Sequence, residues 1–153
     1  MKQSLFDAVG GLATLQKVHK IFYDKVYAHD WLKQFFAGHD QQIIEDKQTS
    51  FMAEKMGCSD KNIVQYRGKP LKQAHENMYI TEELYMVRHD LLQQSIAEAG
   101  VPEDLAQRWL KIDKAFIRLI SKSSMEAFYR DYHFAHKQRI IFPKPDISNP
   151  DST

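Results

Sequence analysis

The sequence predicts an all-α protein, because its apolar residues recur at steps of three or four along four long segments. No segment shows the alternation of β-branched residues that is typical of a strand. All six glycines lie between the periodic segments, where helix ends favour a residue that tolerates positive φ. A length of 153 residues with 43% hydrophobic residues fits one domain with one core.

The helices are expected to differ in strength, and four of them are long and well patterned. The first has Leu12, Leu15, Val18, Phe22 and Val26 on one face. Each of the others has a comparable apolar stripe, and the predicted ranges are 12–28, 40–56, 81–99 and 102–128.

The segments between these helices are shorter or polar. A short turn is expected over 30–36, with Asp30 as its N-cap. Residues 59–69 read as a polar connection, and 70–78 have room for two helical turns at most. Three prolines crowd the last eleven residues, which predicts an extended tail.

Composition excludes several classes of protein. A formal charge of +1 leaves no surplus of cations for a nucleic acid or an anionic membrane. No apolar run approaches the roughly 20 residues of a membrane span, and the polar start is unlike a secretory signal. A single cysteine, Cys58, cannot form an internal disulfide, so we expect a cytoplasmic protein. The common hydrolase, phosphate-loop and zinc motifs are all missing from the sequence.

Three polar residues break their local patterns. Tyr23 lies at the edge of the first apolar stripe, and Gln48 lies between Ile44 and Met52 on the next. A buried phenol or amide without a partner costs about 1–3 kcal/mol, so these two point either to a ligand or to unseen backbone and water partners. His75 stands in a short segment after Pro70 and reads as a capping, packing or ligating residue. The remaining histidines are expected to be solvated.

Taken together, the motifs resemble the truncated haemoglobins, specifically group 1. The ordered set runs from Ser4 to about Ile120 and comprises Leu5-Phe6-x-x-Val9-Gly10-Gly11, Phe22-Tyr23, Phe35-Phe36-Ala37-Gly38, Lys47-Gln48, Tyr66-x-Gly68, Lys72-Gln73-Ala74-His75, Ile80-Thr81 and Gly100-Val101-Pro102. The resemblance implies a two-over-two helical sandwich around haem b.

The resemblance also implies roles for single residues. His75 matches the proximal ligand of the haem iron, and Tyr23 and Gln48 match the distal pair that donates hydrogen bonds to a bound gas. Phe36 matches the phenylalanine on the haem face, and Lys47 is placed to reach a haem propionate or to stay solvated. The other haem-binding positions are Ile44, Phe51, Met52 and Tyr66. No histidine matches a distal position, so we expect an open sixth site in the ferrous state, with His39 as the one exception to consider.

Several functions are compatible with these residues. The first is reversible binding of O₂, and of CO and NO, by a monomer or weak homodimer. Its uses would be oxygen transport or NO detoxification, the latter with electrons from an external reductase. The second is a gas sensor acting through residues 123–153, which extend past the globin domain of residues 1–122 as a continued helix and a Pro-rich tail. The third is a haem-free helical regulator. Aromatic and basic residues in the extension are expected to cover the body or a second subunit, and no nucleic acid partner is expected.

Overall fold

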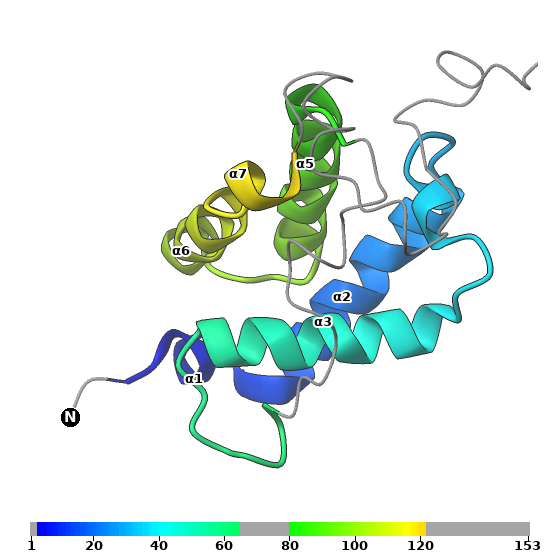
Figure 1. The fold of residues 1–153 in the computed structure, drawn as a ribbon. Coiled ribbons are helices and arrows are strands. Elements are labelled where there is room, and N and C mark those ends of the chain that lie inside the picture. Colours follow the sequence, from blue (N-terminus) through cyan, green and yellow to red (C-terminus); the bar gives the residue numbers. More distant parts are fainter. Residues whose placement is uncertain (1–2, 65–79, 122–153) are drawn as a thin grey trace, which may run out of the picture.

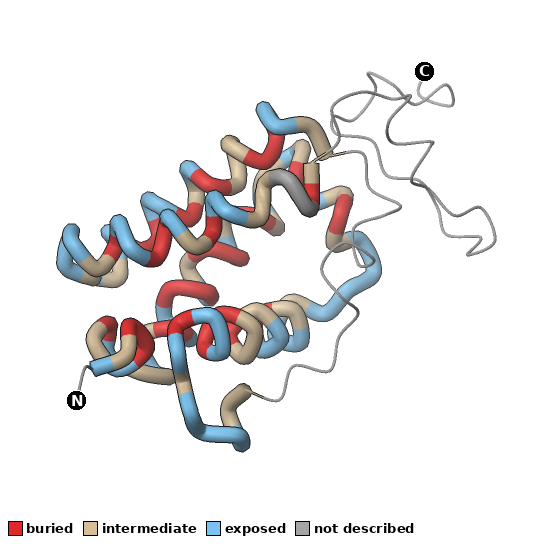
Figure 2. The backbone as a smooth tube through the Cα atoms, turned by 60° about the vertical axis from the view of Figure 1, so that its left-hand side comes forward, coloured by how far each residue is buried: buried red, intermediate tan, exposed pale blue. Residues whose placement is uncertain are grey.

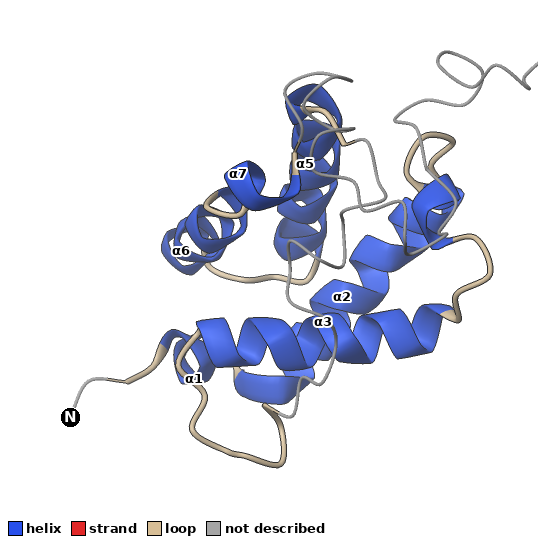
Figure 3. Ribbon diagram, in the orientation of Figure 1, coloured by secondary structure: helices blue, strands red, loops and turns tan. Residues whose placement is uncertain are grey.

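The computed structural model describes residues 3–64 and 80–121, apart from the side chains of residues 118 and 119. All regular structure in these ranges is helical, as Figure 3 shows. In chain order the elements are α1 (Leu5–Val9), α2 (Gly11–Ala28), the 3₁₀ helix η1 (Lys33–Phe36), α3 (Gln41–Lys55), α5 (Glu82–Glu98), α6 (Glu103–Lys114) and α7 (Ile117–Ile120). No helix in these ranges is long and apolar enough to cross a membrane.

The long helices form two layers. Helix α3 crosses α2 in one layer, and α6 packs beside α5 in the other (Figure 1). Helix α2 contacts both α3 and α5, so it joins the layers, while short α1 packs against α2 and α6. The arrangement is a two-over-two helical sandwich.

Local chemistry explains where the helices begin. The side chains of Ser4, Asp40 and Thr81 each accept a hydrogen bond from a backbone N–H in the first turn of α1, α3 and α5. Such N-caps satisfy donors that have no partner inside the helix. The predicted helices over 12–28, 40–56 and 81–99 are confirmed to within one residue at each end.

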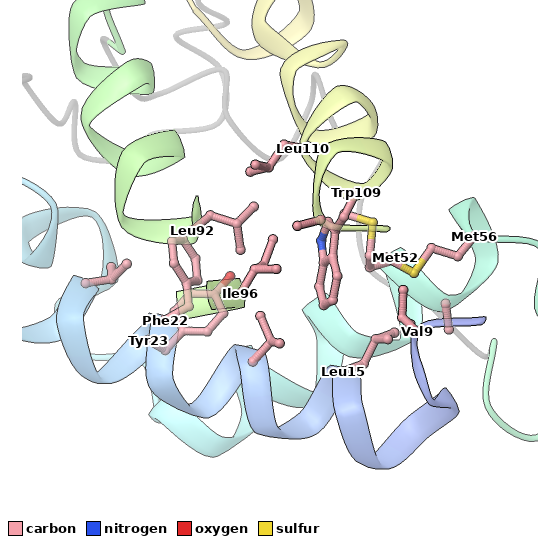
Figure 4. Packing of buried hydrophobic residues seen from close by; sticks show 14 of the residues in the cluster. Val9, Leu15, Phe22, Tyr23, Met52, Met56, Leu92, Ile96, Trp109 and Leu110 are labelled. Carbon is pink, nitrogen blue, oxygen red and sulfur yellow. The ribbon is translucent and has the colours of Figure 1, made fainter. Parts of the chain in front are cut away.

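One apolar cluster fills the space between the layers. Figure 2 shows the buried residues on the inward sides of the helices. In Figure 4, Trp109 projects from α6 into this cluster, and Phe22 and Tyr23 of α2 lie near Leu92 and Ile96 of α5. Trp109 and Ile96 are both 0% exposed, so the place where the two layers meet is fully buried.

The prediction of one unbroken helix over 102–128 is wrong. Helix α6 ends at Lys114, α7 spans only Ile117–Ile120, and Ser121 has an extended backbone. The carbonyl of Asp113, which would accept from Ile117 in a continuous helix, accepts instead from the Tyr85 hydroxyl and the Phe116 N–H. This side-chain bond from α5 therefore competes with the helical ladder. Residues 122–128 lie outside the described ranges.

The expected N-cap at Asp30 is also wrong. The 3₁₀ helix begins at Lys33, and the Nδ1 atom of His29 accepts hydrogen bonds from the N–H groups of Trp31 (3.1 Å) and Leu32 (3.4 Å). Asp30 instead forms an exposed ion pair with Lys33 at 3.4 Å. An imidazole acceptor thus takes the role that sequence reasoning gave to a carboxylate.

Candidate functional site

Tyr23 is a buried phenol set among aromatic rings. Its side chain on α2 is 5% exposed and lies edge-on to the rings of Phe22 (4.8 Å between centroids), Phe36 (5.8 Å) and Tyr27 (6.5 Å). Within residues 3–64 and 80–121 no hydrogen bond to its hydroxyl is present. Burial raises the pKa of Tyr23 well above its ordinary value, and the positive charge of Arg88 only partly offsets this effect. Tyr23 is therefore a protonated, unengaged hydrogen-bond donor at neutral pH.

The predicted site residues on α3 follow its inner face. Met52 is buried, while Ile44, Gln48 and Phe51 are half-buried. Ile44 packs against the core cluster, and the ring of Phe51 lies 5.4 Å from that of Phe116. The amide of Gln48 forms no hydrogen bond within the described part of the chain, so it too is available as a donor.

The structure separates the predicted residues into three groups. It brings Tyr23 and Phe36 into ring contact and places Gln48 on the helix packed against that of Tyr23. Lys47 is exposed, as a residue that reaches outward to a propionate must be, and His39 is exposed just before α3. His75 and Tyr66 lie outside the described residues, so their roles stay predictions. No cluster of three metal-ligating side chains occurs in the ranges that are described.

A charged cluster between α5 and α6 was missed by the sequence analysis. Nη1 of Arg88 donates to both carboxylate oxygens of Asp113, at 2.7 and 2.9 Å. The Nδ1 atom of His89 lies 2.8 Å from the same carboxylate, which is only 2% exposed. Burial alone would raise the pKa of Asp113, but the charge of Arg88 and the hydrogen bonds hold it below its usual range. Asp113 is therefore a buried, ionised carboxylate that binds α5 to α6.

His19 was also missed, because the histidines other than His75 were expected to be solvated. That expectation is wrong for His19, which is 1% exposed, and for His89, which is 8% exposed. Nδ1 of His19 is 2.7 Å from the Thr49 hydroxyl, and its Nε2 has no partner within the described residues. Burial, with a smaller effect from Arg88, lowers the pKa of His19 to about 3, so the ring is neutral.

A sequence signal for these residues was present. Arg88 lies four residues from both Leu84 and Leu92, and Asp113 lies four residues after Trp109, which puts both on apolar stripes. His19 likewise lies between Leu15 and Phe22. The test that selected Tyr23 and Gln48, a polar residue on an apolar face, selects these three as well when it is applied to every helix.

The described side of the site fits a haem. Phe36 is in ring contact with Tyr23, and Ile44 and Met52 of α3 belong to or pack against the same apolar cluster, which suits an apolar group such as a porphyrin. Tyr23 supplies a buried phenol that has no hydrogen bond within the described residues. A short all-helical sandwich with these apolar residues and such a phenol is the architecture of a small globin.

Comparisons with known proteins agree with this class. Residues 4–128 match the family described as bacterial-like globin. The chain is 32% identical over 101 residues to the group 1 truncated haemoglobin of Mycolicibacterium paratuberculosis, an alignment covering 66% of this chain and 71% of that protein. It is 31% identical over 107 residues to the group 1 truncated haemoglobin of Synechocystis, covering 67% and 82%.

A solved structure gives the same fold. The truncated haemoglobin of Tetrahymena pyriformis in its Fe(III) form superposes with a TM-score of 0.71 at 22% identity, covering 79% of this chain and all of that one. The chain therefore belongs to the bacterial-like globins, among the truncated haemoglobins of group 1. The resemblance seen in the sequence is confirmed, and membership of this family implies haem as the cofactor.

Proposed function

We propose that this globin binds O₂ reversibly, and CO and NO at the same place, with His75 as the proximal ligand and Tyr23 and Gln48 as distal hydrogen-bond donors. The observation that carries the proposal is the Tyr23 hydroxyl, which belongs to a residue only 5% exposed and has no hydrogen bond within the described residues. A hydrogen bond from this phenol to an acceptor atom on a bound gas would contribute about 1 kcal/mol.

The haem iron supplies the bond to the gas, and the chain supplies its surroundings. Because burial keeps Tyr23 protonated, its phenol donates rather than repels an atom that carries partial negative charge. Edge-on contacts with Phe22 and Phe36 restrict the ring and so orient the hydroxyl. Because Tyr23 is only 5% exposed, little water reaches its side chain, which strengthens any hydrogen bond formed there.

The test is the rate of O₂ dissociation from wild type and Tyr23→Phe by stopped flow. We expect release to be tenfold faster or more, equivalent to about 1.4 kcal/mol for one hydrogen bond. Tyr27→Phe is the matched control, because the Tyr27 hydroxyl donates to the His39 carbonyl at 3.1 Å and should not touch the gas. An unchanged rate in Tyr23→Phe would remove this residue from the site.

Gln48→Leu should also speed release. If Tyr23 and Gln48 donate to the same atom, the double variant should show less than the product of the two single effects. If the rate increase in the double variant equals the product of the two single increases, the donors act on separate atoms.

Slow release of O₂ also suits conversion of NO to nitrate, because the O₂-loaded protein persists long enough to meet NO. That reaction draws one electron from the haem for each nitrate formed, so a cycle needs an external reductase. Consumption of NO in the presence of O₂ and a reductant, with nitrate as product, would support this use. The sensor alternative depends on residues 123–153, which lie outside the described ranges.

A further inference from the structure

A cation lies behind the distal tyrosine. The guanidinium carbon of Arg88 is 5.2 Å from the centre of the Phe22 ring and 5.5 Å from that of Tyr85. The Phe22 ring in turn is 4.8 Å from the ring of Tyr23. Arg88 on α5 therefore stands one aromatic ring away from the proposed gas site on α2.

The Arg88 side chain is held in place from the opposite direction. Both bonds to Asp113 use Nη1, and Asp113 is shared with His89. Nη2 and Nε have no hydrogen bond within the described ranges, and the side chain is 23% exposed against 2% for Asp113. The carboxylate belongs to α6, while the guanidinium lies over the Phe22 ring of α2.

Arg88 has the largest effect of the charges that act on Tyr23. It lowers the pKa of the phenol, while Asp113, Tyr27 and Glu45 each have a smaller raising effect. The cation of the ion pair therefore acts on the phenol more strongly than the carboxylate of the same pair does. Because Tyr23 is only 5% exposed, solvent screens this interaction less than it would at the surface.

We propose that Arg88 is a specificity-determining residue that makes the distal site favour ligands with negative charge or negative polarisation, small inorganic anions and O₂, over the nearly neutral CO. This inference rests on the proposed function, since it requires Tyr23 to face the ligand. Asp113 opposes this effect. Its carboxylate fixes the position of the Arg88 side chain and reduces the positive potential that Arg88 produces.

The pair gives two variants with opposite predicted effects. Arg88→Met removes the cation and leaves the carboxylate, so binding of an anion should weaken. Asp113→Asn removes the carboxylate and leaves the cation, so binding of the same anion should tighten. A purely structural pair would change affinity in the same direction in both variants, since each loses the same contacts between α5 and α6.

The experiment is titration of the ferric haem-loaded protein with azide. We expect the azide Kd to rise by about threefold or more in Arg88→Met and to fall by a similar factor in Asp113→Asn. Arg88→Lys keeps the charge and is the matched control, with a Kd closer to wild type than that of Arg88→Met. The CO stretching frequency, which reads the local field, should rise in Arg88→Met and fall in Asp113→Asn.

The outcomes separate the two proposals. Shifts in the same direction, or none, in the variants that fold would overturn the role of Arg88. If Arg88→Met does not fold, the sign of the change in Asp113→Asn decides alone, and a weaker azide complex there contradicts the inference. Tyr23→Phe measured alongside shows whether the phenol faces the ligand, so failure of the proposed function appears as an unchanged O₂ release in that variant.

Discussion

Acid should destabilise this globin through one buried imidazole. His19 is enclosed by α2, α3 and α6, with Thr49 on Nδ1 and the Trp109 ring edge-on at 5.9 Å. Its pKa is about 3 in the folded protein, against 6.5 for an ordinary histidine. Because the unfolded chain takes up a proton that the folded one does not, stability is complete above pH 6.5 and is lost as the pH falls toward 3.

The size of the loss follows from the shift. Each pH unit below 6.5 costs about 1.4 kcal/mol, so the free energy of unfolding should fall by about 2 kcal/mol at pH 5 through this group alone. The assay is urea unfolding of the haem-loaded protein, followed by far-ultraviolet circular dichroism at pH 7.5 and pH 5. Wild type and His19→Gln are compared, so that contributions from the other histidines cancel.

We expect His19→Gln to lose about 2 kcal/mol less than wild type between the two pH values. Thr49→Val is the control, because it removes the hydrogen bond of 2.7 Å but keeps the buried imidazole, and it should retain the wild-type pH dependence. An equal loss in wild type and His19→Gln would refute the account of His19 as a neutral, desolvated ring.

Three further predictions concern stability at neutral pH, each measured as a change in the urea midpoint. Gly10→Ala should cost more than Gly38→Ala, since both have positive φ (115° and 81°) but only at Gly10 would the new Cβ meet a neighbour, Thr14 Oγ1 at 2.2 Å; equal costs would contradict this. Trp109→Ala should cost about 3–5 kcal/mol for the cavity, and a cost below 1 kcal/mol would show that the core is not packed as described. Thr81→Ala should cost about 1 kcal/mol for the lost N-cap of α5, while Thr81→Ser should cost little.

The helices were predictable because their signals are local. Spacing of apolar residues and caps such as Thr81 act within one or two turns, so α2, α3 and α5 could be bounded from the sequence. The break after Lys114 depends on a bond from Tyr85, 28 residues away, and no local pattern contains it.

The site was predictable in part for the same reason. Tyr23 and Gln48 could be selected because each interrupts its own apolar stripe. The pairing of Arg88 with Asp113 joins two helices and appears only once they pack. His19 also lies on an apolar stripe, between Leu15 and Phe22, and was missed because that test was not applied to it.

The most direct test of the account is an absorption spectrum of the haem-loaded protein, ferric, reduced and under CO, for wild type and His75→Ala. We predict a sharp Soret band that shifts with CO in wild type and is lost or altered in His75→Ala. The same spectrum in wild type and His75→Ala, or only the broad band of free haem in both, would contradict a haem held by His75.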